Sequence, residues 1–112
     1  MAIDNANVID GMGIDRENTA LRLLLTDHLQ WIECADTISE YDHLLMLQEK
    51  INAYISYIET EQFKTKYPDV DFKMAIIDIR FKYDITENCE KFLQAVQDQI
   101  GQYGIKIEAR IG

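Results

Sequence analysis

Apolar residues recur along this chain with two different periods, and the changes of period predict its secondary structure. Alternation of apolar and polar residues is typical of half-buried strands, whereas recurrence at every third or fourth residue is typical of amphipathic helices. Alternating segments occupy residues 8–14, 19–25, 71–83 and 105–111, and helical segments occupy residues 41–62 and 84–104. The predicted order is therefore strand, strand, helix, strand, helix, strand.

The first two strands are expected to form a hairpin. The polar sequence DREN at 15–18 supplies turn residues between them. Gly11 and Gly13 interrupt the first strand, and glycines at such positions indicate a bulge or a close approach of the backbone to a neighbour.

The first helix carries the strongest helical pattern in the chain, YDHLLMLQEKINAYISYIETEQ. Thr37 or Ser39 is expected to cap its amino end, because a hydroxyl oxygen accepts a hydrogen bond from a free backbone N–H there. Lys64 and Lys66 are expected near its carboxyl end, where cations are favoured, and Pro68 forbids continuation.

The second helix is expected to begin after an N-cap at Thr86 and to close at Gly104, a residue suited to a left-handed backbone. Two amphipathic helices each need an apolar surface to cover, and a four-stranded sheet provides one. We therefore predict an α+β fold of ββαβαβ order, with both helices on one face of the sheet. Residues 1–112 are expected to form a single domain, and the strand order stays open.

Charge narrows the expected partners. The chain has 20 acidic and 11 basic residues and a net charge of −9. No lysine or arginine lies between Arg22 and Lys50, and this interval holds Asp27, Glu33, Asp36, Glu40, Asp42 and Glu49. Such a surface repels phosphate backbones and anionic membranes, so we expect neither nucleic acid nor membrane as a partner. It attracts a basic protein, although acidity also serves solubility alone.

Location is inferred from the cysteines and the amino terminus. Cys34 and Cys89 are far apart and form no CxxC pattern, which favours a reducing compartment over a disulfide framework. The segment MAIDNANVID lacks the basic and apolar regions of an export signal, and no apolar run is long enough to cross a bilayer. We expect a soluble, cytoplasmic protein.

The sequence TDHLQW at 26–31 is the best candidate for a functional surface. It follows the last core leucine of the second strand, where a rigid scaffold presents exposed polar groups. We expect Trp31 to act as an aromatic anchor with an acidic rim. The candidate binding residues are Asp27, His28, Trp31, Glu33, Asp36, Glu40 and Asp42. The alternative is structural: His28 caps a strand or contacts a helix end, and Trp31 packs over the sheet edge.

Other chemistry has weaker support. No HxxxH or CxxC spacing is present, so we expect no metal and no cofactor. Cys89 lies at the positive end of the second helix, which lowers a thiol pKa. It also starts an apolar stripe with Phe92, so a buried structural role is favoured. The sequence GMG at 11–13 is followed by no helix and is no phosphate cradle.

The combination of NVID…ID at 7–15, TDHLQW at 26–31 and HLLMLQEKINAYISYIE at 43–59 resembles a family of small bacterial proteins classified only as a domain of unknown function. The resemblance extends from about residue 7 to residue 103. It implies a bacterial, cytoplasmic, single-domain protein. It brings no catalytic residue, cofactor or substrate.

Three functional hypotheses follow. The first is a non-enzymatic interaction module that binds a basic protein, for example as the neutralising partner of a toxin or nuclease. The second is a small-ligand binder or enzyme with a site near His28, which requires a pocket with converging polar groups. The third is a homodimeric structural module, in which a second subunit covers the doubly apolar start of the third strand at Phe72, Met74 and Ile76.

Overall fold

The computed structural model describes residues 8–17, 19–31 and 39–112. Within these residues the chain folds in the predicted order and in the predicted α+β class. The elements are β1 (Gly11–Asp15), β2 (Ala20–Asp27), α1 (Glu40–Glu59), β3 (Met74–Phe81), α2 (Glu87–Ile100) and β4 (Ile105–Ile111). Short 3-10 helices at Gln62–Thr65 and Gly101–Tyr103 follow α1 and α2.

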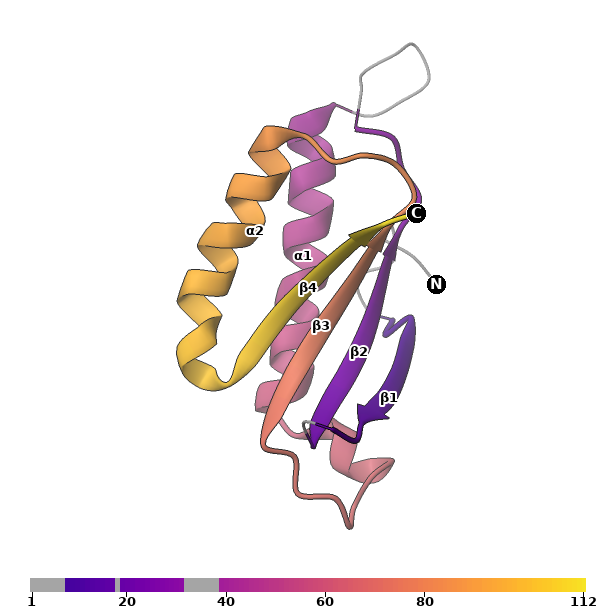
Figure 1. Cartoon of the computed structure of the whole chain (residues 1–112), viewed down its shortest axis with the longest axis vertical. Coiled ribbons are helices and arrows are strands. Elements are labelled where there is room, and N and C mark those ends of the chain that lie inside the picture. Colours follow the sequence, from indigo (N-terminus) through magenta and orange to yellow (C-terminus); the bar gives the residue numbers. More distant parts are fainter. Residues whose placement is uncertain (1–7, 18, 32–38) are drawn as a thin grey trace.

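The strands form one mixed sheet in the order β1-β2-β3-β4. β1 pairs antiparallel with β2, which confirms the hairpin, and β2, β3 and β4 run parallel. Both helices cover the same face of this sheet (Figure 1). The carboxyl ends of the three parallel strands therefore meet at one end of the molecule, beside the amino ends of both helices.

The hydrophobic core lies between the sheet and the helices. Alternate residues of the strands point into it, as the period-two pattern predicts. The largest contributors are Leu21, Leu23, Leu25, Ile77, Ile79 and Phe81 from the strands and Leu47, Ile51, Tyr54 and Leu93 from the helices. This burial supplies the main driving force for folding.

The predicted helix caps are present. Ser39 Oγ accepts a hydrogen bond from the backbone N–H of Asp42 (3.1 Å), and Thr86 Oγ1 accepts one from the N–H of Cys89 (3.2 Å). Gly104 has a φ of 76°, a left-handed conformation that favours glycine and lets the chain turn directly into β4. The close approach predicted at Gly11 is also confirmed, because an added Cβ would lie 3.2 Å from the Leu24 side chain.

The predicted end of the first helix is wrong. α1 ends at Glu59, and Glu61 adopts a left-handed backbone with a φ of 58°. The chain turns there because Phe63 is buried and packs edge-on against Phe72, with ring centroids 5.5 Å apart. Tertiary packing thus stops the helix before Pro68 does, and Lys64 lies in the following 3-10 helix instead of the last turn of α1.

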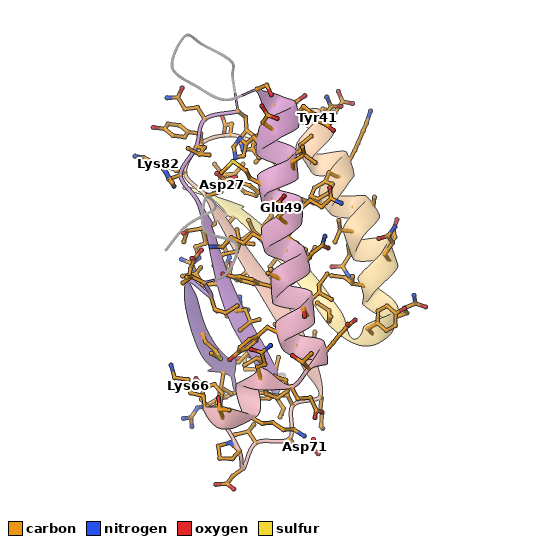
Figure 2. The ribbon with its side chains drawn as sticks, turned by 180° about the vertical axis from the view of Figure 1, so that it is seen from behind. Asp27, Tyr41, Glu49, Lys66, Asp71 and Lys82 are labelled. Atoms are coloured by element: carbon orange, nitrogen blue, oxygen red, sulfur yellow. The ribbon has the colours of Figure 1, made fainter. Side chains whose placement is uncertain are left out.

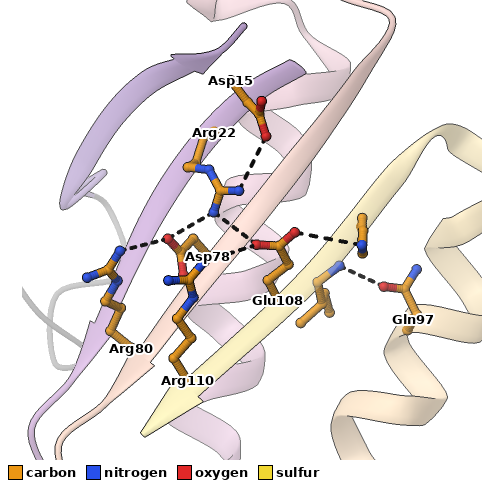
Figure 3. Close-up of polar contacts among 9 residues, drawn as sticks. Asp15, Arg22, Asp78, Arg80, Gln97, Glu108 and Arg110 are labelled. Atoms are coloured by element: carbon orange, nitrogen blue, oxygen red, sulfur yellow. Dashed lines mark hydrogen bonds and ion pairs between the residues drawn. The ribbon is translucent and has the colours of Figure 1, made fainter. Parts of the chain in front are cut away.

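The face of the sheet opposite the helices carries a network of charges (Figure 3). The guanidinium of Arg22 lies 3.0 Å from Asp78 Oδ2, 3.1 Å from Glu108 Oε1 and 3.5 Å from Asp15 Oδ2. Asp78, predicted on a solvent-facing side, is only 2% exposed. Ile76 is buried within the chain as well, so this position of β3 does not need a second subunit to cover it.

Candidate functional site

The residue that ends β2, Asp27, points into the interior instead of toward solvent. Its Oδ2 lies 2.6 Å from Nε2 of His43 in α1, and both side chains are fully buried. Its Oδ1 accepts a hydrogen bond from the backbone N–H of Leu29 at 3.1 Å, which bends the chain directly after the strand. The pair ties the carboxyl end of β2 to the first turns of α1.

Trp31 completes this cluster. The turn at Asp27 brings the chain back so that the indole of Trp31 stacks on the imidazole of His43. The same indole meets Phe81, at the end of β3, edge-on with centroids 6.1 Å apart. Within TDHLQW, Asp27 therefore points into the interior and His28 points to solvent. Trp31 folds back and lies over His43, the partner of Asp27.

The location predicted for two site residues is therefore wrong. Trp31 is only 4% exposed and Asp27 is buried, so neither presents a surface to a partner. His28 is exposed, as expected. Glu33 and Asp36 lie outside the described residues.

The remaining two candidate residues belong to α1. Glu40 and Asp42 occupy its first turn, where negative charge is favoured by the helix dipole. Glu40 also accepts a hydrogen bond from Asn88 Nδ2 at 2.9 Å, so the first turns of α1 and α2 are neighbours.

The thiol of Cys89 is not activated for nucleophilic chemistry. Cys89 is buried, and burial together with the negative charges of Asp27 and Glu40 raises the pKa of its thiol to about 12. A thiol with this pKa is protonated at neutral pH and is a poor nucleophile. The predicted burial of Cys89 is thus confirmed, and the helix-end effect on its pKa is outweighed.

A buried ion pair was also missed from the sequence. Lys50 of α1 has a fully buried side chain, and its Nζ lies 2.8 Å from Asp10 Oδ1. Asp10 Oδ2 also accepts hydrogen bonds from the N–H and hydroxyl of Thr26. Burial raises the pKa of Asp10, but the hydrogen bonds from Lys50 and Thr26 outweigh it, so the pKa is lowered overall.

Tyr54 joins the same network from the next turn of α1. Its hydroxyl donates to the carbonyl oxygen of Leu24 at 2.5 Å and accepts a hydrogen bond from the N–H of Asp10 at 2.9 Å. Burial raises the pKa of Tyr54. Both buried pairs thus use α1 to hold the first two strands, because Asp10 directly precedes β1 and Asp27 is the last residue of β2.

A shallow hollow lies beside His28, at the carboxyl ends of the parallel strands. Its volume is about 200 Å³, and it is lined by Thr26, Asp27, His28, Arg80, Phe81, Lys82 and Gly112. The exposed polar side chains that line it are those of His28, Arg80 and Lys82, and none of them is acidic. The hollow therefore suits a small anion better than a basic protein.

The outer side of α1 carries an acidic surface with two exposed apolar side chains. Tyr41 is 70% exposed, and Leu45, one turn later, is 39% exposed. Asp42 and Glu49 are exposed beside them. Glu49 lies on the side of α1 that faces away from the sheet, whereas Asp27 lies beside the helix, near the end of β2 (Figure 2). Below, Glu40, Tyr41, Asp42, Leu45 and Glu49 are called the α1 surface.

Among residues 8–17, 19–31 and 39–112, no three His, Cys, Asp or Glu side chains are grouped to hold a metal ion. In the same residues, no helix has the length and apolar character needed to cross a membrane.

The fold and these clusters define a small α+β domain with buried polar pairs and an acidic, partly apolar helix surface. Over residues 1–112 the chain matches the family described as Family of unknown function (DUF6572), and it belongs to that family. Neither the curated proteins nor the solved structures include a match to the chain.

Proposed function

We propose that the chain is a non-enzymatic interaction module that binds a basic protein through the α1 surface. The observation that supports this most directly is the exposure of Tyr41 and Leu45 within an acidic segment. Residues four apart on a helix are neighbours, so the two apolar side chains form one contact spot. Aromatic anchors surrounded by a polar rim are typical of the residues that dominate binding energy.

Charge supports a basic partner. Positions 40–49 contain Glu40, Asp42 and Glu49 and no lysine or arginine. Clustered carboxylates raise the association rate of an oppositely charged protein, and salt screens this effect. A toxin or nuclease that is neutralised by this chain is one concrete partner of this chemistry. The competing explanation is that the acids only maintain solubility, and in that case no partner depends on them.

Capture from the native host tests the proposal. The full chain is immobilised, a retained protein is identified and purified, and its association with the wild-type chain is followed at increasing salt. We expect a basic partner whose association slows as salt rises. Tyr41→Ala should weaken binding by about tenfold or more, and Glu49→Lys should mainly slow association.

Tyr103 provides the matched control. It is 66% exposed, nearly as much as Tyr41, but it follows α2 at the opposite end of the molecule from the start of α1. Tyr103→Ala should leave binding unchanged. Binding that is insensitive to salt and equally affected by both tyrosine substitutions would contradict a role for the α1 surface.

A second candidate is a small-anion binder at the hollow beside His28. It is favoured by the side chains of His28, Arg80 and Lys82 around one cavity of about 200 Å³. Titration with inorganic phosphate, followed by amide chemical shifts, tests it. Saturable shifts confined to the carboxyl ends of β2 and β3, and lost in Lys82→Gln, would support this candidate. Uniform shifts would exclude it.

A further inference from the structure

The outer edge of the sheet is β4, and its backbone groups alternate between two directions. The N–H of Ala75 donates to the carbonyl of Gly104 (2.9 Å), and the N–H of Gly112 donates to the carbonyl of Phe81 (2.9 Å). Because β3 and β4 pair in parallel, these two bonds mean that the backbone N–H and C=O groups of the even-numbered residues of β4 point toward β3. The N–H and C=O groups of Ile105, Ile107, Ala109 and Ile111 therefore point outward.

Gln97 of α2 satisfies the first half of this edge. Its side-chain oxygen accepts a hydrogen bond from the N–H of Ile107 (2.6 Å), and its side-chain nitrogen donates to the carbonyl of Ile105 (3.1 Å). The amide thus replaces the backbone of a neighbouring strand. Within the described part of the chain, no strand pairs with the outer side of the second half, where Ala109 and Ile111 are exposed.

A groove runs beside this open half. It has a volume of about 350 Å³ and lies between α2 with its preceding loop and the edge strand. Ile85, Leu93 and Gln94 line one wall, and Ile107, Ala109 and Ile111 line the other. Apolar side chains from an added strand would enter this groove, because alternate residues of that strand point to the helix side of the sheet.

We propose that two copies of this chain join through this edge, with their β4 strands antiparallel about a twofold axis at Ala109. In this register Glu108 lies opposite Arg110 of the second copy, and Ile107 lies opposite Ile111 of the second copy. Opposite charges and apolar pairs directly across from one another stabilise antiparallel strands. The small side chain of Ala109 at the axis leaves room for side chains of each copy to enter the groove of the other. A twofold contact of this kind joins two copies and adds no further ones.

Three neighbouring antiparallel registers are disfavoured by charge or by Gln97. A twofold axis at Glu108 or at Arg110 places like charges directly opposite each other, which is destabilising. An axis at Ile107 requires the N–H that Gln97 already occupies. The axis at Ala109 pairs opposite charges, and the N–H groups of both Ala109 residues gain carbonyl partners. Ile107 lies opposite Ile111 of the second copy with its N–H still held by Gln97, so only the Ile107 carbonyl takes part, as the acceptor for the Ile111 N–H.

Sedimentation of the full chain over a range of concentrations tests this proposal. We expect a reversible dimer, with slowed amide exchange at Ala109 and Ile111 as concentration rises. Arg110→Glu and Glu108→Arg should each raise the dissociation constant about tenfold or more, because each places like charges across both symmetric pairs. An equimolar mixture of the two variants should recover dimerisation, because the heterodimer restores both opposite-charge pairs.

A backbone variant serves as an independent test. Ala109→Pro removes only an outward N–H, and proline is tolerated on an edge strand when that group faces solvent. It should fold, as judged by circular dichroism, and stay monomeric. A wild-type chain that is monomeric up to about 1 mM overturns the proposal. So does a dimer that persists in Ala109→Pro, because that dimer would use another surface.

Discussion

The indole of Trp31 lies nearly parallel to the imidazole of His43, with ring centroids 3.5 Å apart and 13° between the ring planes. The stack covers the hydrogen bond between His43 and Asp27 and helps to exclude water from it. A charged or polar pair in such a place is costly to break, because removal of one partner leaves the other buried without compensation. This cluster therefore has its main effect on stability, and it is the basis of the first prediction.

His43→Ala should lower the free energy of unfolding by about 3 kcal/mol, because the Asp27 carboxylate would stay buried without its partner and the Trp31 ring would lose its contact. Urea unfolding followed by tryptophan fluorescence measures the change. The neighbouring histidine supplies the control, since His28 is exposed. His28→Ala should stay within about 0.5 kcal/mol of wild type. Equal effects of the two substitutions would show that the buried pair is unimportant.

Arg22→Ala should destabilise the fold by about 2 kcal/mol. Asp78 is almost fully buried, and Arg22 is its shorter arginine contact, at 3.0 Å compared with 3.3 Å for Arg80. Arg80→Ala is the matched control: its side chain is 56% exposed, and exposed ion pairs contribute little. Thermal unfolding of both variants checks the difference. A larger loss for Arg80→Ala would refute the central position of Arg22.

Asp10 should make stability depend on pH in the acid range. Its pKa is lowered in the folded state from the ordinary value of 3.8, so the unfolded chain binds a proton more readily. The stabilisation from Asp10 is present above pH 3.8 and is lost as the pH falls through the folded-state pKa. Asp10→Asn should therefore give a shallower decline of unfolding free energy with acid. Identical pH profiles for the two proteins would contradict this assignment.

Cys89 should resist thiol reagents in the native state. Its pKa of about 12 and its burial both disfavour the reactive thiolate. In a Cys34→Ser variant, which leaves Cys89 as the one thiol of the chain, Ellman's reagent at about pH 8 should react only as fast as the protein unfolds. Addition of denaturant should release one thiol at once. Rapid reaction without denaturant would show that Cys89 is accessible.

The order of elements and the fold class could be predicted because the apolar period changes between strands and helices, and because the polar turn DREN separates the two consecutive strands. The caps at Ser39 and Thr86 could be predicted for a local reason: a hydroxyl three residues before a free N–H is sufficient. The end of α1 could not, because it depends on a contact between Phe63 and Phe72 that a local pattern does not contain.

The partner of Asp27 was missed although the sequence holds a signal for it. The buried residues of α1 are His43, Leu47, Lys50, Ile51 and Tyr54. His43 and Lys50 are seven residues apart, two helical turns, and lie on the same inward side as the leucine and isoleucine. Buried polar groups require partners, so each predicts a carboxylate on the facing strands. Which carboxylate it meets depends on how the chain bends after β2, and the sequence pattern alone does not define that bend.

The side-chain amide of Gln97 occupies backbone groups on the outer edge of β4 and so limits where another strand can pair with the sheet. If that amide becomes a carboxylate, by substitution or by slow deamidation, it loses its donor and places a negative charge against the Ile105 carbonyl. The carbonyl of Ile105 then becomes available to an added strand, while a carboxylate oxygen still accepts from the Ile107 N–H. Chemical ageing of a single polar residue would thus extend the open part of the sheet edge, without any change in the apolar segments of the chain.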